Sequence, residues 1–437
     1  MPKLRTLPIS WKALFLLTVF SPVAAPQSSQ EFQQILERLD RLEKENRRLA
    51  EEVRSLRTEL AAQGEAAPEV PLDTPVDKAP LEERVAVQER RIEEQAQAKV
   101  EASQRHPIKL TGMALFNTFL NSRYNGDAEN PTTASREAGP ATGGAYLRQS
   151  VIGLEFNGPR TLWGGAVHGS FYMDFFAGSG TPLNQSLRIR TASIDIDWGN
   201  TSVMAGQEKP IISPREPNSL AQVGVSPLTN AGNLWLWYPQ VRVEQNFELG
   251  EQSNVRAQVG IFQTSERSSL VPPEFADTLA RSRPALQGRI EFARSLDDQR
   301  RLEIAPGFHT SSSHVAATSV ASNLVSVDWF ANPWRRIEFS GMFFRGQNIA
   351  NLGALRQGFT IIGTGNVIPV HSTGGWAQLT FLATPRLSFN IYGGQHDDRN
   401  SDLLFGGIAK NQAYAANAMY RLSSNVIVSL EGSQVRT

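Results

Sequence analysis

The side chains of this sequence that could act on another molecule are arginines and glutamates spaced two residues apart. The three pairs are Arg242 with Glu244, Arg289 with Glu291, and Arg336 with Glu338. Residues two apart in a β-strand point to the same face, and apolar residues lie between and beside these pairs. Arg256, between Val255 and Ala257, has the same setting. Charges on the wall of a water-filled channel select solutes by the sign of their charge, whereas the alternative role is only to hold the wall together.

A second group of polar residues lies in the segment 209–233, which is too long to be a plain connection between strands. Loops of this length inside a compact domain are usually functional or disordered. We expect the loop to fold inward, with Lys209, Arg215 and Glu216 lining a constriction and Asn218 nearby. The alternative is a loop that only covers the outer surface.

Composition and spacing predict no catalytic residue, no cofactor and no metal site. The chain has no cysteine, so disulfides, thiol chemistry and cysteine-ligated metals are excluded. Its six histidines are scattered without the spacing of metal ligands. Lys plus Arg and Asp plus Glu both number 43, so no net charge attracts the chain to nucleic acid.

The N-terminus has the pattern of a secretory signal peptide over residues 1–25. Lys3, Arg5 and Lys12 precede or begin an apolar run from Ala13 to Phe20, and small residues follow it. The run is too short to span a membrane as a helix, and the alternative is a cytosolic N-terminal helix. The signal predicts export from the cytoplasm.

Residues 28–63 carry a seam of apolar residues, with one asparagine, spaced alternately three and four apart, which predicts a coiled coil. These positions are Phe32, Ile35, Leu39, Leu42, Asn46, Leu49, Val53, Leu56 and Leu60. The seam predicts a homo-oligomer and leaves dimer or trimer open; a single amphipathic helix on a membrane is the alternative. Residues 64–80 are rich in proline and read as a linker, and 81–106 as a charged helical connector.

From residue 107 to 437 the sequence predicts β-strands, and we count fifteen between residues 108 and 435. Their connections alternate between very short and long. Short ones are Gly199-Asn200, Asn332-Pro333, Thr384-Pro385 and Ser423-Ser424; long ones are 123–143, 209–233, 264–283, 347–368 and 396–410. This alternation is typical of transmembrane barrels, whereas Greek-key sandwiches mix their connection lengths.

Tryptophan placement and one hairpin support an antiparallel transmembrane β-barrel. Outside the signal, the tryptophans lie at expected strand ends: Trp163, Trp198, Trp235, Trp237, Trp329, Trp334 and Trp376. Barrels in lipid place aromatic girdles at both interfaces. In the hairpin 374–394, alternation turns Leu379, Phe381, Phe389 and Ile391 toward lipid, and Gln378 and Asn390 toward the lumen. Strict alternation also places Arg148, Arg188 and Arg190 on the lipid side, unless a β-bulge turns them inward.

Three stretches resemble the DcaP-like outer-membrane porins: RTASIDIDWGN with TSVMAGQEKP, GGWAQLTFLATPRLSFNIYGGQ, and NQAYAANAMYRLSSNVIVSLEGSQVRT. Phosphate-selective porins are similar more distantly. The resemblance implies a trimeric, sixteen-stranded porin in outer-membrane lipid, with the coiled coil in the periplasm. It also implies passive uptake of small anionic solutes of dicarboxylate or phosphate type, and it matches the 209–233 loop to the constriction loop of porins.

The strand count departs from this family in one respect. Single-chain bacterial barrels have an even number of strands, and fifteen is odd. We therefore expect one more loop and strand beyond Thr437; the alternative is a missed strand within 353–362. Two other functions stay open: a structural anchor whose coiled coil links the outer membrane to periplasmic partners or peptidoglycan, and a barrel enzyme, for which no converging nucleophile and base are visible.

Overall fold

The computed structural model describes residues 108–122, 129–135, 139–178, 185–266, 271–363, 365–404 and 406–437. The predicted signal peptide, coiled coil, linker and helical connector all lie outside the described residues and remain predictions. Within the described part of the chain, no helix is long and apolar enough to cross a membrane.

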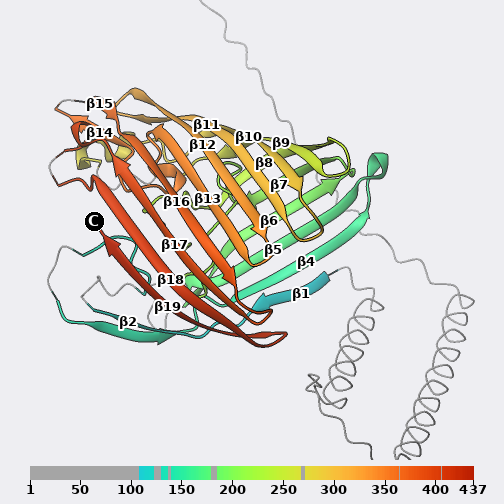
Figure 1. Cartoon of the computed structure of the whole chain (residues 1–437). Coiled ribbons are helices and arrows are strands. Elements are labelled where there is room, and N and C mark those ends of the chain that lie inside the picture. Colours follow the sequence, from blue (N-terminus) through green and yellow to red (C-terminus); the bar gives the residue numbers. More distant parts are fainter. Residues whose placement is uncertain are drawn as a thin grey trace, which may run out of the picture. The chain divides into compact units, whose positions relative to one another are not determined.

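One antiparallel sheet of fifteen strands dominates the fold and curls around an interior (Figure 1), which confirms the expected strand count and order. Every strand pairs with the next one in the sheet, from β1 to β19. Its strands are β1 (Ile108–Met113), β4 (Val151–Arg160), β5 (Ala166–Ala177), β6 (Ser186–Asp197), β7 (Thr201–Glu208), β8 (Tyr238–Glu248), β9 (Ser253–Gln263), β10 (Pro284–Ser295), β11 (Arg301–Val315), β12 (Thr318–Trp334), β13 (Ile337–Gln347), β16 (His371–Leu382), β17 (Leu387–Asp398), β18 (Lys410–Ser423) and β19 (Val426–Arg436).

Four further strands form two small sheets apart from the large one. β2 (Asn117–Asn121) pairs with β3 (Thr142–Tyr146), and β14 (Phe359–Ile362) pairs with β15 (Asn366–Pro369). The alternative that 353–362 supplies a sixteenth strand of the barrel is therefore wrong, because β14 belongs to a separate hairpin. Short 3-10 helices lie in the connections: η1 (Leu162–Gly164), η2 (Pro273–Thr278), η3 (Ala350–Leu352) and η4 (Asn400–Asp402).

The β11–β12 hairpin differs from the expected alternation of short and long connections. β11 and β12 pair as far as Val315 and Thr318, so only Ala316 and Ala317 form the turn at the end where the other loops are long. Both alanines have positive φ, 50° and 56°, as a tight hairpin turn with the twist of its strands requires. The residues between 310 and 318 extend two strands instead of forming a loop.

Alternate side chains of the large sheet divide into an apolar outer face and a polar inner face. In β16 and β17, Leu379, Phe381 and Ile391 are exposed, whereas their inward neighbours Gln378 and Asn390 are buried. Similar outward positions on other strands are Val241, Val259, Ile261, Ile290, Phe292, Ile304, Val325 and Phe343. A soluble protein buries its apolar side chains and exposes its polar ones. The reverse order seen here is explained by lipid around the barrel.

The interior contains a hydrophobic cluster at the long-loop end of the barrel. Loop residues such as Ile212 and Leu234 pack there against wall residues such as Phe344. Trp235 and Trp376 belong to this cluster, with 8% and 3% of their surfaces exposed. The expected aromatic girdle is therefore wrong for these two tryptophans. It fits Trp163 at the short-turn end, which is 89% exposed.

Candidate functional site

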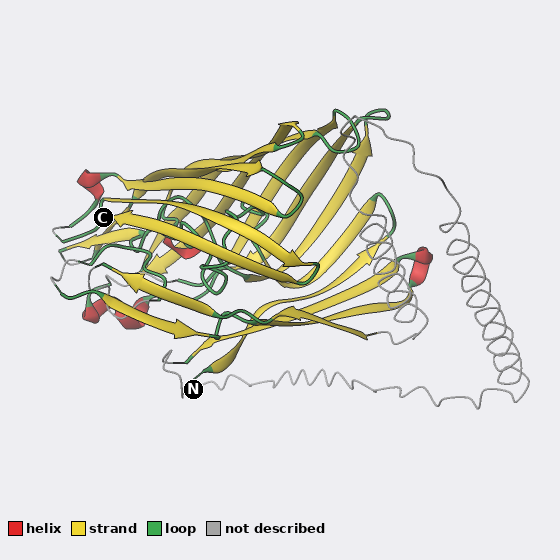
Figure 2. Cartoon of the chain, turned by 60° about the horizontal axis from the view of Figure 1, so that its bottom comes forward, coloured by secondary structure: helices red, strands yellow, loops and turns green. Residues whose placement is uncertain are grey.

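The connection between β7 and β8, residues 209–237, lies inside the barrel and is here called the inner loop. Its backbone and side chains contact three separate parts of the barrel: the wall of β10–β12, the wall of β16–β19, and the turn before β4 together with β6. Figure 2 shows loop segments (green) within the ring of strands. Gly232 permits one close approach, because its φ is +102° and a Cβ there would lie 2.1 Å from the Gly375 carbonyl oxygen.

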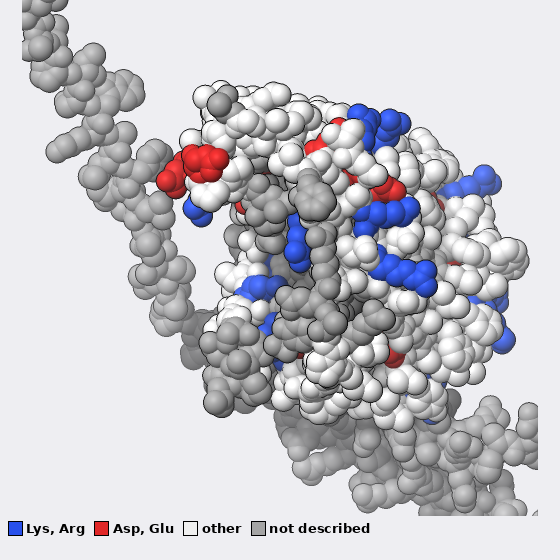
Figure 3. Space-filling model, turned by 90° about the vertical axis from the view of Figure 1, so that its left-hand side faces the viewer, with Lys and Arg blue, Asp and Glu red and all other residues white. Residues whose placement is uncertain are grey.

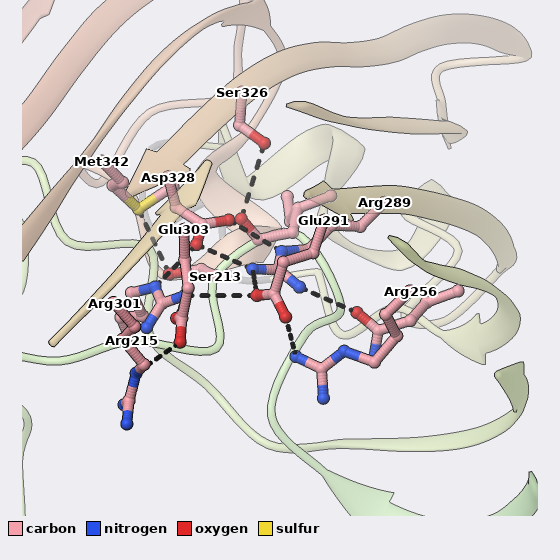
Figure 4. A network of polar contacts seen from close by, with 12 residues as sticks. Ser213, Arg215, Arg256, Arg289, Glu291, Arg301, Glu303, Ser326, Asp328 and Met342 are labelled. Atoms are coloured by element: carbon pink, nitrogen blue, oxygen red, sulfur yellow. Dashed lines mark hydrogen bonds and ion pairs between the residues drawn. The ribbon is translucent and has the colours of Figure 1, made fainter. Parts of the chain in front are cut away.

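Arg215 attaches the first half of the inner loop to the wall formed by β10, β11 and β12. Its guanidinium lies 2.8 Å from Asp328 Oδ1, 2.5 Å from Glu303 Oε2 and 3.2 Å from Glu291 Oε2. One arginine thus bridges carboxylates from three neighbouring strands (Figure 4). Ionised hydrogen bonds of this kind are about twice as strong as neutral ones, so the loop is firmly held here.

The same network includes three wall arginines. Arg289 is fully buried and donates to Asp328 Oδ2 at 2.7 Å and to Glu291 Oε2 at 2.5 Å. Arg256 lies 2.8 Å from Glu291 Oε1, and Arg301 lies 2.6 Å from Glu303 Oε1. Four arginines therefore share three carboxylates, which gives the network an excess of one positive charge (Figure 4).

Wall amides and one carboxylate hold the middle of the inner loop against the wall of β16–β19. The Asn218 backbone N–H donates to Gln378 Oε1 at 2.6 Å, and its carbonyl accepts from Asn417 Nδ2 at 2.8 Å. Ser219 Oγ donates to Glu431 Oε2 at 2.7 Å. The Asn218 side chain lies 3.5 Å from Asn390 Oδ1, so this residue positions the loop mainly through its backbone.

The second half of the inner loop is held by Gln149, in the turn before β4, and by two arginines of β6. Buried Gln149 accepts hydrogen bonds from the backbone N–H groups of Val223 and Gly224, at 2.5 and 2.6 Å. Arg188 donates to the Gly224 carbonyl at 2.5 Å, and Arg190 donates to the Val223 carbonyl at 2.8 Å. Loop carbonyls and loop N–H groups are thus both satisfied by wall side chains.

A β-bulge in β6 directs Arg188 and Arg190 into the lumen. The pairing with β5 shifts register between Tyr172 and Met173, which pair with Thr191 and Ile189 and leave Arg190 without an opposite residue. An extra residue reverses the faces of the strand beyond it, so both arginines reach buried Asp174, at 2.6 and 3.0 Å. Strict alternation, which placed them toward lipid, is therefore wrong at this point.

Aromatic rings separate the arginines of this wall. The Arg148 guanidinium lies 3.9 Å from the centre of the Phe176 ring, and Arg188 lies 5.0 Å from both Phe176 and Trp237. Arg190 lies 4.8 Å from Trp237. Cations over ring faces are stabilised by the ring quadrupole while their N–H groups remain available at the edges. The like charges can therefore lie near one another.

Arg148 also pairs with Glu129, at 3.1 Å, in the connection that precedes β3. Burial raises the pKa of the Glu129 carboxyl above its ordinary value, and the positive charge of Arg148 offsets part of the rise.

The remaining predicted residues occupy different positions. Lys209 forms an ion pair with Glu216, whose other oxygen accepts from Ser226 Oγ at 2.7 Å. Arg242 and Glu244 pair at 2.9 Å on the same face of β8, as their spacing indicates. Arg336, however, is exposed in the turn between β12 and β13, and only Glu338 lies in a strand, so the predicted pair does not share the lumen wall.

The basic partner is more exposed than the acidic partner in nearly all of these ion pairs. Arg256 is 35% exposed against 8% for Glu291, and Arg301 is 57% exposed against 13% for Glu303. The same order holds for Arg188 and Arg190 against Asp174, Arg215 against its three partners, Arg242 against Glu244, and Lys209 against Glu216. Arg289 and Arg148 are the exceptions, since each is less exposed than its acidic partner. Within most of these pairs the base is therefore more accessible to lumen water than the acid.

Sequence reasoning missed the carboxylates that organise the site. Asp174 lies between Met173 and Phe175, Glu303 between Leu302 and Ile304, and Asp328 between Val327 and Trp329. Alternation would have placed all three in the lumen, since each has apolar neighbours on both sides. Within the described part of the chain, no group of three or more His, Cys, Asp or Glu residues is placed to hold a metal ion.

Replacing Asp174 with asparagine is expected to lower the free energy of unfolding by about 2 kcal/mol, because two buried arginine contacts lose their charged acceptor. The matched control is Asp297→Asn, which weakens a partly exposed pair with Arg300 in a turn. Thermal unfolding of both variants in detergent measures the difference. Equal stability of the two variants would contradict the structural role of Asp174.

Comparisons with known proteins show the fold. No family model matches the sequence, and no curated protein matches it. The outer membrane channel DcaP of Acinetobacter baumannii superposes with a TM-score of 0.61 at 18% identity, over 75% of this chain and 90% of that one. An anion-selective porin from Comamonas acidovorans superposes with a TM-score of 0.52 at 11% identity, over 75% and 88% of the two chains. The resemblance seen in the sequence is thus confirmed at the level of the fold, which is that of the outer-membrane porins.

Proposed function

We propose that this protein is an outer-membrane porin through which small hydrophilic anions diffuse passively. The excess exposure of the bases over the acids in the lumen carries the proposal, because the chain as a whole has equal numbers of both. Ions in a narrow aqueous path respond to the charges that they approach, and buried carboxylates behind arginines contribute less at that surface. The similarity to an anion-selective porin supports the same sign of selectivity.

The geometry favours solutes with planar or tetrahedral anionic groups, of dicarboxylate or phosphate type. Arg188, Arg190 and Arg301 each present a guanidinium beside an aromatic ring, and guanidinium N–H groups match the oxygens of carboxylates and phosphates. Assembly as a homotrimer with a periplasmic coiled coil is part of the proposal. The heptad seam in residues 28–63 supports an oligomer, and the resemblance to DcaP-like porins supports the trimer.

The test is the zero-current potential of the purified protein in a planar bilayer of neutral lipid under a potassium chloride gradient. We expect its sign to show preference for chloride, and the preference to fall as the salt concentration rises, because the Debye length shortens from about 10 Å at 0.1 M to about 3 Å at 1 M. A cation-selective or unselective channel would support the porin function but contradict the proposed anion selectivity. A folded protein without conductance would favour the structural anchor instead.

A further inference from the structure

The outer face of β13 and β16–β18 changes from apolar to charged near the long-loop end. Strand pairing places four outward side chains in one row, since Arg345 pairs with Thr373, Thr373 with Asp397, and Asp397 with Lys410. Nearer the short-turn end, the corresponding row contains Phe381 and Phe389 as direct partners. The charged row therefore lies above a surface suited to acyl chains.

A second polar row lies directly below the first on β17–β19. Gln395 pairs with Gln412, and Gln412 with Arg436, while Phe343 occupies the same row on β13. Gln412 Nε2 donates to Gln395 Oε1 at 2.7 Å, and Gln395 Nε2 donates to Asp397 Oδ2 at 3.3 Å. These side chains are linked to one another on the outer surface and do not reach the lumen network.

Positive charge exceeds negative charge in this group, here called the outer basic patch and made up of Arg345, Gln395, Asp397, Lys410, Gln412 and Arg436. Asp397 is its single acid and lies 3.3 Å from Lys410. Arg345 is exposed and forms no ion pair within the described residues, and Arg436 lies over the Tyr414 ring at 5.5 Å. Figure 3 shows basic side chains (blue) gathered on the right-hand side of this end of the molecule.

We propose that the outer basic patch binds the phosphate of a membrane lipid headgroup. The next row toward the loops is polar: Thr310 Oγ1 donates to Asn323 at 2.8 Å, and the row continues through Gln347 to His371, which pairs with Asp402. The patch therefore lies at the boundary between acyl chains and headgroups. Basic side chains at this depth attract anionic lipid, and guanidinium groups bind phosphate through paired N–H donors. A second copy of the chain fits less well, because it would have to present acids against an unpaired Arg345.

The proposal rests on the placement of the barrel in a membrane but not on its ion selectivity. The test uses the full-length protein in detergent with a diphosphorylated glycolipid, lipid A, and native mass spectrometry to count bound lipid. The triple variant Arg345→Gln, Lys410→Gln, Arg436→Gln removes the charge with little change in size. We expect its lipid affinity to fall at least tenfold, since each basic side chain near a lipid surface contributes about fivefold.

The matched control is the triple variant Arg242→Gln, Arg256→Gln, Arg301→Gln, which removes the same charge from the lumen and is expected to bind lipid A as the wild type does. Dephosphorylated lipid should bind the wild type as weakly as lipid A binds the patch variant. Inorganic phosphate should compete with lipid A only if the patch recognises free phosphate instead of a lipid headgroup. Complete displacement of lipid A by an equal concentration of inorganic phosphate would overturn the lipid assignment.

Equal affinity of the patch variant and the wild type for lipid A would overturn the proposal. Loss of the oligomer in the patch variant with unchanged lipid binding would assign the patch to contact between copies instead. Channel recording is a separate measurement. Conductance like that of the wild type shows that the patch variant has folded. If the wild type shows no conductance but still binds lipid through the patch, only the proposed porin function is contradicted.

Discussion

The variant Arg215→Ala is expected to form channels with a larger and less steady single-channel conductance than the wild type. Arg215 joins the inner loop to three carboxylates of β10, β11 and β12. Without it, Glu303 keeps one arginine partner and the loop loses its only charged attachment to this wall among the described contacts. Removing one partner of a buried ion pair costs about 3–5 kcal/mol, so the loop should leave its position and widen the path.

Planar-bilayer recording of single channels measures this effect. Arg242→Gln is the matched control, because it also removes one lumen charge but its ion partner, Glu244, lies on the same strand. Arg215→Lys tests geometry against charge, since an ammonium cannot bridge three separate carboxylates in the plane of a guanidinium. If Arg215→Ala and Arg242→Gln had the same conductance, Arg215 would not hold the loop in place.

The double variant Arg256→Gln, Arg301→Gln is expected to lose the anion preference. These are the two most exposed arginines of the network, and their partners Glu291 and Glu303 remain ionised beneath them. The network then changes from four arginines and three carboxylates to two arginines and three carboxylates, so its net charge reverses from +1 to −1. The zero-current potential under a salt gradient should move to zero or change sign.

The matched control for this variant removes two positive charges outside the lumen. Arg335 and Arg386 are exposed in the short turns that follow β12 and β16, so Arg335→Gln, Arg386→Gln changes the total charge equally. We expect this control to keep most of the wild-type potential, because water screens exposed charges away from the path. A similar change in both double variants would show that selectivity follows net charge and not the lumen network.

The barrel could be predicted from the sequence because its pattern is local and repeated. Alternation of side chains in the hairpin 374–394 and the short turn at Thr384-Pro385 specify both strands and the buried face, and the pairing of Leu379 with Ile391 agrees. The β11–β12 hairpin was predicted too short, because its outer part, with Ser311 and Ser313, is polar on both faces and lacks alternation. The small β14–β15 sheet is too short to be assigned to the barrel or excluded from it by pattern alone.

The site was only partly predictable, because its contacts join residues far apart in the chain. Spacing indicated that Arg289 and Glu291 share a face, and they do. No local pattern indicates that Arg215 reaches Asp328, which is 113 residues away. The bulge at Arg190 is also invisible to strict alternation, since an inserted residue changes the register without a marker in the sequence.

The attachment of the inner loop to three parts of the wall has a mechanical consequence. A thin-walled tube flattens easily, whereas an internal loop attached at Asp328, Gln378 and Gln149 opposes flattening in more than one direction. Lateral pressure from a crowded bilayer then deforms the lipid around the protein before it deforms the pore. We expect the cross-section of the lumen to depend less on membrane tension in the wild type than in a variant whose inner loop is released.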